Sequence, residues 1–162
     1  KSSKIHSGEK RKRQPEEDID ASNEANHSST VHHLLEAAHL ARNGSVRAQH
    51  GAVIYVPSDD NNGGTKVIGR GWNHDFILDR SASNKNKLVL HSEVHAVADA
   101  IRNHGEDECF EKLFPRATIL IAELDSDYAY EDSHPCPKCH PLLRAVGITK
   151  VLHTTAHGKV NC

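Results

Sequence analysis

Two short segments of the chain carry residue types that together can hold a metal ion. His91-Ser92-Glu93 supplies an imidazole and a carboxylate, and Pro135-Cys136-Pro137-Lys138-Cys139 supplies two thiols in a C-x-x-C arrangement. One imidazole and two thiolates are good ligands for zinc, and three ligands leave the fourth tetrahedral position open to water. A structural zinc site normally closes with a fourth protein ligand, so three is the number that a catalytic site needs.

Glu93 follows the histidine by two residues. From there a carboxylate can reach a water molecule on the zinc without being a ligand itself, and zinc lowers the pKa of that water to near neutrality. The alternative interpretation of Glu93 is a carboxylate in the first turn of a helix that interacts only with the helix dipole. For the two cysteines alone, a structural metal clip or a redox pair is the alternative.

The elements that must position these residues follow from apolar patterning. Ser29-Thr30 can cap a helix whose apolar face would comprise Val31, Leu34, Leu35, Ala38 and Ala41. A strand over 51–56, turn residues over 57–64 and a strand over 66–69 predict a hairpin, followed by a loop over 73–87. Further helices are predicted around 94–101 and over 135–146, and further strands over 117–124 and 148–153. Four histidines are expected at the surface or its boundary: His32, His33, His39 and His50.

Length and composition describe one globular domain. The chain has 162 residues and a net charge of −2, which argues against binding nucleic acid by charge alone. No apolar run approaches the roughly 20 residues of a membrane helix, which excludes a membrane-spanning protein. Residues 1–29 carry few apolar side chains and are predicted to be a disordered polar tail, with the folded domain over 30–162. The basic run at 10–13 is read as a solvated charged tail, with a nuclear import signal as the alternative.

The number and spacing of the cysteines indicate the redox environment in which the protein works. Four cysteines are too few for a disulfide scaffold, and a C-x-x-C pair suits a reducing environment. An intracellular location, cytoplasmic or nuclear, is therefore expected. The chain starts at Lys1 and contains no methionine, so it is expected to be a fragment, and an organelle is not excluded.

The order H-x-E followed by P-C-x-x-C resembles the signature of the zinc-dependent nucleobase deaminases, the cytidine and deoxycytidylate deaminase superfamily. Residues 48–73 look like the first hairpin of that superfamily, and the element order over 30–153 is similar to its fold. The resemblance implies an α/β protein with three α/β/α layers and a mixed sheet whose first two strands form a hairpin.

The resemblance also implies an activity, a cofactor and site residues. The chain would be a zinc-dependent hydrolytic deaminase acting on a nucleobase, with cytosine favoured and adenine the alternative. His91, Cys136 and Cys139 would bind Zn²⁺, Glu93 would shuttle protons during attack by zinc hydroxide, and Asn73 would contact the sugar. The substrate would be a nucleotide, a nucleoside or a base in single-stranded nucleic acid.

The sequence departs from the family pattern at two places. Ser92 stands where alanine is usual, and its hydroxyl adds a polar group beside the metal. The spacing from Glu93 to Pro135 is longer than in compact members, and the excess lies in 103–115 and in the acidic segment 125–134. The histidine ligand places the chain nearer the deoxycytidylate, tRNA-adenosine, APOBEC-like and riboflavin-pathway branches than the free-cytidine deaminases. The short Cys136–Cys139 spacing weighs against the riboflavin branch.

A rival hypothesis is a non-catalytic member that keeps zinc for stability and serves as a subunit of a hetero-oligomer. Such subunits typically lose the glutamate, and this chain keeps Glu93. The resemblance implies a homo- or hetero-oligomer of unspecified number.

Overall fold

The computed structural model describes residues 21–59, 64–77 and 87–162, with the backbone alone at 21–27, 76–77 and 87. In chain order its larger elements are α1 (Ala21–Ala41), β1 (Gln49–Pro57), β2 (Thr65–Trp72), β3 (His74–Ile77), β4 (Lys87–Leu90), α2 (Ser92–His104), β5 (Thr118–Leu124), α4 (Cys139–Ala145) and β7 (Lys150–Thr154). The shorter ones are α3 (Glu106–Glu108), the helical turns η1 (Cys109–Leu113) and η2 (Phe114–Arg116), and the strands β6 (Tyr130–Glu131) and β8 (Val160–Asn161).

One mixed sheet organises the molecule, with strand order β2-β1-β5-β7-β8 and β6 paired to β5. β1 and β2 are antiparallel neighbours, so the predicted hairpin is confirmed. β5 runs antiparallel to β1 and parallel to β7, which makes the sheet mixed as expected. The strands predicted over 117–124 and 148–153 correspond to β5 and β7.

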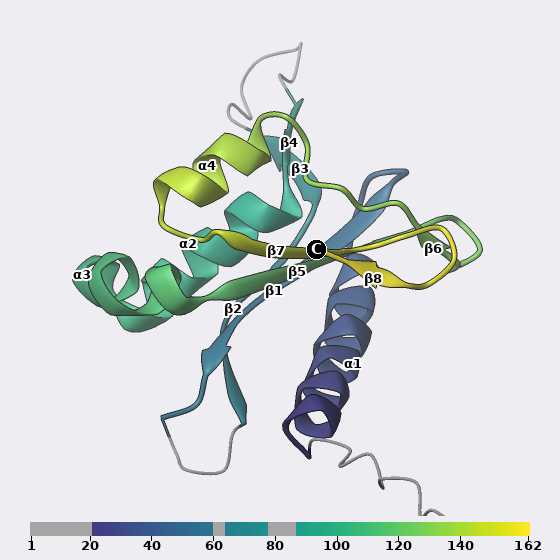
Figure 1. Ribbon diagram of the computed structural model, residues 1–162. Helices are drawn as coiled ribbons and strands as arrows, with labels where there is room; N and C mark the ends of the chain where they lie inside the picture. The colour runs from purple at the N-terminus through teal and green to yellow at the C-terminus, as the bar shows by residue number, and fades with distance from the viewer. Residues whose placement is uncertain (1–20, 60–63, 78–86) are drawn as a thin grey trace, which may run out of the picture.

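Helices cover both faces of this sheet, which gives three α/β/α layers (Figure 1). On one face α2 and α4 pack against β1 and β5 through a core that includes Ala96, Leu143, Ile54 and Ile121. On the other face α1 packs against the alternate residues of the same strands. Successive side chains of β1 and β5 point to opposite faces of the sheet, so each strand contributes to both cores, as expected for a strand buried on both sides. The predicted fold class is confirmed.

The buried face of α1 differs from the one that the apolar pattern predicts. Of the predicted face, Ala38 and Ala41 are buried but Val31 and Leu35 are exposed, and Ala37 and Leu40 are buried in addition. The reason is a close approach to β1, because a Cβ on Gly51 would lie only 2.0 Å from the carbonyl oxygen of Ala37. Only small residues allow the helix and strand to come this near, so alanine stands at the point of closest approach, while Leu40 is buried beside it.

α1 also begins earlier than predicted. The sequence suggests a start at Ser29-Thr30, but the helix runs from Ala21. Most of the predicted polar tail lies outside the described residues, and its last part, 21–29, belongs to α1. A polar segment has no apolar stripe of its own to indicate a helix, so the pattern shows only the part that packs on the sheet.

The predicted loop over 73–87 contains two strands. β3 pairs antiparallel with β4, from His74 opposite Leu90 to Ile77 opposite Lys87, and the two form a separate small sheet. The remainder of that loop, 78–86, lies outside the described residues. β4 leads directly into the segment that carries His91, so this small sheet positions the start of α2.

His33 is buried, contrary to the expectation of a surface histidine. Its side chain is 3% exposed, stacks on the ring of Tyr55 at 4.0 Å and lies 2.7 Å from Thr65 Oγ1 through Nε2. Burial lowers the pKa of His33 from 6.5, and Glu36 opposes that shift. The folded state therefore binds the His33 proton less readily than the unfolded chain does.

This difference predicts an acid-sensitive contribution to stability. Above pH 6.5, the ordinary value, His33 is neutral in both states and contributes no pH dependence. As the pH falls below it, the unfolded chain takes up the proton first, so the free energy of unfolding decreases. We expect the melting temperature to fall less between pH 7 and pH 5 in His33→Gln than in the wild type. His39→Gln, at an exposed position of the same helix, should keep the wild-type decrease, and an equal decrease in all three proteins would contradict the assignment.

Gly71 holds α2 close to β2. A Cβ at this position would lie 2.2 Å from the carbonyl oxygen of Ser92 and 2.4 Å from the backbone nitrogen of Ala96. Neither backbone group can move away without shifting the helix. We expect Gly71→Ala to lower the free energy of unfolding by about 3 kcal/mol in denaturant titration.

The matched control for that substitution is Gly64→Ala at the start of the same hairpin arm. A Cβ there would meet only the Cβ of Ser58, at 4.0 Å, which is ordinary contact. A loss of stability in Gly64→Ala as large as in Gly71→Ala would show that contact with α2 is not the cause.

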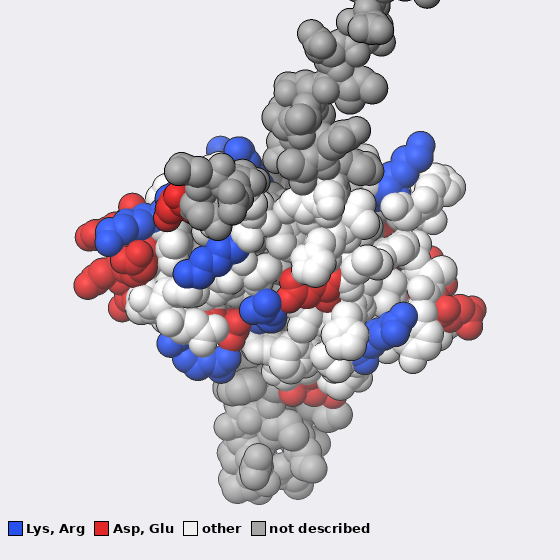
Figure 2. Space-filling view, turned by 90° about the horizontal axis from the view of Figure 1, so that it is seen from below, with Lys and Arg blue, Asp and Glu red and all other residues white. Residues whose placement is uncertain are grey.

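The surface carries charges of both signs. Figure 2 shows Lys and Arg side chains interspersed with Asp and Glu on the face drawn, without one continuous basic field. Among the described residues, no helix combines the length and the apolar character that crossing a bilayer requires.

Candidate metal centre

His91 occupies the N-cap of α2. Its backbone is extended, with φ −75° and ψ 149°, and its carbonyl accepts the N–H of His95 at 3.0 Å. The N-cap geometry turns the chain from β4 into the helix and leaves the imidazole outside the helical turns. The side chain makes no capping hydrogen bond, so it is available for another partner.

The two cysteines lie on either side of a tight turn at the start of α4. The carbonyl of Cys136 accepts the N–H groups of Cys139 and His140 at 3.0 and 3.1 Å. The helix begins at Cys139 rather than at the predicted Pro135, because Cys136 to Lys138 form this turn. The turn places both thiols on the side that faces His91.

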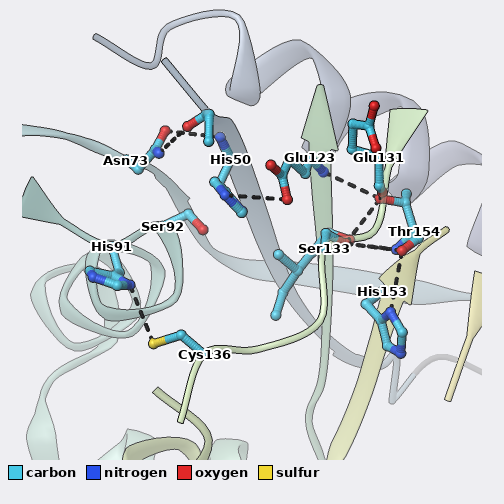
Figure 3. Close-up of polar contacts among 12 residues, drawn as sticks. His50, Asn73, His91, Ser92, Glu123, Glu131, Ser133, Cys136, His153 and Thr154 are labelled. Carbon is cyan, nitrogen blue, oxygen red and sulfur yellow. Dashed lines mark hydrogen bonds and ion pairs between the residues drawn. The ribbon is translucent and has the colours of Figure 1, made fainter. Parts of the chain in front are cut away.

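The structure brings the three predicted ligands together. Nδ1 of His91 lies 3.5 Å from Sγ of Cys136 and 3.4 Å from Sγ of Cys139, and the three donor atoms lie within 4.8 Å of one another. Tetrahedral zinc with ordinary bond lengths would separate a nitrogen and a sulfur ligand by about 3.6 Å. The donor set and its spacing therefore fit zinc, and Figure 3 shows His91 and Cys136 facing each other.

The electrostatics around Cys139 also fit a cation. Burial raises the pKa of the Cys139 thiol well above its usual range, and the neighbouring carboxylate of Glu93 raises it further. A buried thiolate beside a carboxylate needs positive charge to balance it, and a divalent metal supplies that charge. The backbone N–H of Cys139 donates to Sγ of Cys136 at 3.3 Å, a contact that suits a sulfur carrying negative charge.

A cavity of about 130 Å³ opens beside these donors. Glu93 lines it and is only 4% exposed, and its Oε2 accepts the Ser92 hydroxyl at 3.1 Å. The carboxylate is therefore largely shielded from bulk water and lines a small cavity next to the metal ligands. The full lining is His50, Asn73, Val89, His91, Ser92, Glu93, His134 and Cys136.

Asn73, which the resemblance assigns to the sugar, lines the same cavity. Its Oδ1 accepts the backbone N–H of His50 at 2.9 Å, and its Nδ2 donates to the carbonyl of Ala48. The side chain thus ties the end of β2 to the start of β1. One amide hydrogen and one oxygen lone pair remain for another partner.

His50 is a cavity residue that the sequence analysis missed. It lies directly opposite Glu123 in the β1–β5 pair, and its Nε2 is 3.5 Å from the Glu123 carboxylate (Figure 3). Burial raises the pKa of Glu123, while the imidazole of His50 acts to lower it. The only signal in the sequence is the period of two, which places His50 on the strand face of Ala52, and the pairing with β5 is not readable from it.

His134 is also missed, because it stands in an irregular segment without periodicity. His95, four residues after His91, does not line the cavity. Its ring packs edge-on against Trp72, with centroids 4.5 Å apart, and its Nδ1 contacts the Trp72 backbone. His95 therefore holds α2 to the end of β2.

No protein-family model matches the sequence, and no curated protein matches it. Several solved structures resemble this chain. The dCMP deaminase of cyanophage S-TIM5 is 18% identical with a TM-score of 0.48, over 77% of this chain and 81% of that one. The cytidine deaminase of Mycobacterium leprae is 16% identical with a TM-score of 0.46, over 82% and 91%. RibD of Acinetobacter baumannii is 19% identical with a TM-score of 0.43, over 79% of this chain and 28% of that one.

Proposed function

We propose that this chain is a zinc-dependent hydrolytic deaminase of the cytidine and deoxycytidylate deaminase superfamily. One observation carries the proposal: the buried carboxylate of Glu93 lines the same small cavity as two of the three donors of the His91, Cys136 and Cys139 group. A site built only for stability needs no buried acid beside an open cavity. The proposal rests on the chain's own residues.

The roles follow from this arrangement. His91, Cys136 and Cys139 would hold zinc, which supplies Lewis-acid activation of water. Glu93 would take a proton from the attacking water and deliver protons to the ring nitrogen and to the leaving amine. Because Glu93 is buried, its carboxylate is held beside the metal donors and largely shielded from bulk water.

Asn73 would contact the sugar of the substrate through its remaining amide hydrogen and oxygen lone pair. Both of its backbone bonds hold the amide in place, so the contact would need little ordering on binding. The substrate would be a cytosine compound, with adenine as the alternative, either as a nucleoside or nucleotide or within single-stranded nucleic acid. The domain limits 30–162, the homo- or hetero-oligomer and the compartment stay predictions.

The test is a substrate panel. Zinc-loaded protein is incubated with cytosine, adenine and guanine compounds, free and within short RNA and DNA, and the products are weighed by mass spectrometry. Deamination exchanges NH for O, a gain of about one mass unit. We expect this gain with at least one cytosine or adenine compound, and its loss in Glu93→Ala. No turnover by protein with confirmed three-ligand zinc would favour the rival, a non-catalytic subunit of a hetero-oligomer.

A further inference from the structure

Ser92 occupies the central position of the His-x-Glu motif and is completely buried. Its Oγ donates a hydrogen bond to Oε2 of Glu93 at 3.1 Å. Figure 3 shows Ser92 at the start of α2 beside His91. A buried hydroxyl needs a partner, and here that partner is the carboxylate proposed to move protons.

The backbone at Ser92 has no room to adjust. Its carbonyl oxygen lies against Gly71 of β2, where a Cβ would come within 2.2 Å. The first turn of α2 is therefore fixed on the sheet, and so is the Cα of Ser92. A hydroxyl attached to such a fixed backbone can hold a neighbouring group in one orientation through a hydrogen bond.

Glu93 needs such an orienting partner because it stands in the first turn of the helix. Free backbone N–H groups and the positive end of the helix dipole attract a carboxylate there, and the side chain could turn toward them. Proton transfer instead requires a carboxylate oxygen directed into the cavity. Ser92 holds Oε2, and the carboxylate also makes a side-chain hydrogen bond with the Cys139 thiol, so both contacts keep it beside the metal donors.

We propose that Ser92 is a positioning residue that holds the Glu93 carboxylate in the orientation used for proton transfer. This inference rests on the proposed deaminase function and deepens it. In this proposal the hydroxyl acts through Glu93 and not on the substrate, so its effect should fall on the rate of the chemical step and not on substrate binding.

The kinetic test compares Ser92→Ala and Ser92→Cys with the wild type, on the substrate that the panel identifies. Alanine removes the donor, and cysteine keeps most of the volume with only a weak donor. We expect both variants to lower kcat about tenfold with less than a twofold change in KM, and to retain one zinc per chain. A kcat within twofold of the wild type in both variants would overturn the proposal.

A second measurement does not depend on activity. Melting temperatures of zinc-loaded wild type, Ser92→Ala, Glu93→Ala and the double variant form a double-mutant cycle. We expect Ser92→Ala to lower the melting temperature when Glu93 is present. In the Glu93→Ala background the same change should be neutral or stabilising, because the buried hydroxyl then has lost its partner.

Ser133→Ala is the matched control for this cycle. Ser133 is equally buried, but its hydroxyl donates to the carbonyl of Ile121. Its effect on the melting temperature should be the same with and without Glu93. If Ser92→Ala behaved like Ser133→Ala, the positioning role would be refuted. A wild type inactive on the whole panel would instead refute the proposed function, and the cycle would still report the Ser92–Glu93 contact.

Discussion

Substitution of Glu93 by glutamine is expected to lower kcat about a thousandfold while leaving the zinc content at one per chain. Glutamine has nearly the shape of glutamate but cannot accept and return a proton at neutral pH, so the change removes the acid–base step alone. General acid–base catalysis typically contributes between about 10² and 10⁴ in rate. The measurement is steady-state kinetics on the substrate that the panel identifies, with metal analysis of the same sample.

Glu106→Gln is the control for this prediction. Glu106 lies just beyond the C-terminal end of α2 and is exposed, so the same chemical change there should leave kcat unaltered. If Glu93→Gln kept kcat within threefold of the wild type, Glu93 would not be the proton shuttle. The interpretation of a carboxylate that serves only the helix dipole would then stand.

Replacement of Cys139 by alanine should abolish metal binding and the stabilisation that metal provides. A ligand that binds only the folded state at a thousand times its Kd stabilises it by about 4 kcal/mol. For a domain of this size that corresponds to a rise in melting temperature of roughly 10 °C. We expect this rise on adding zinc to the wild type, its reversal by a chelator, and its absence in Cys139→Ala.

Cys162→Ser separates this effect from general thiol chemistry. Cys162 is exposed and is not a member of the His91, Cys136 and Cys139 group. The variant should bind one zinc and show the full rise in melting temperature. Stoichiometric zinc in Cys139→Ala would mean that Cys139 is not a ligand.

The sequence predicts the parts of the structure that are encoded locally. The β1–β2 hairpin follows from an apolar run, a stretch of turn residues and a second strand, all within about 20 residues. α2 follows from apolar residues on one side of a helix, and its start is indicated by the motif that begins at His91. The metal donors could be predicted because imidazole and thiol are rare functional groups whose spacing has chemical meaning.

The features that sequence reasoning missed depend on contacts between distant segments. β3 and β4 are short and each begins with a polar residue, and only their pairing with each other makes them strands. The buried face of α1 depends on the glycine of β1 that it packs against, which no helical periodicity can show. The His50–Glu123 pair requires the β1–β5 register, since each residue alone resembles an ordinary polar strand end.

The position of β1 in the middle of the sheet also has a consequence for synthesis of the protein. β1 pairs with β2, which follows it closely, but its other edge pairs with β5, from Gln49 opposite Leu124 to Tyr55 opposite Thr118. While the chain is being made, the hairpin can form long before β5 leaves the ribosome. Until then the apolar segment 52–56 presents an unpaired edge, although α1 and α2 are made before β5 and can already cover its faces, and that edge favours association with other nascent chains. The slowest and most vulnerable stage of folding is therefore expected to be the wait for β5.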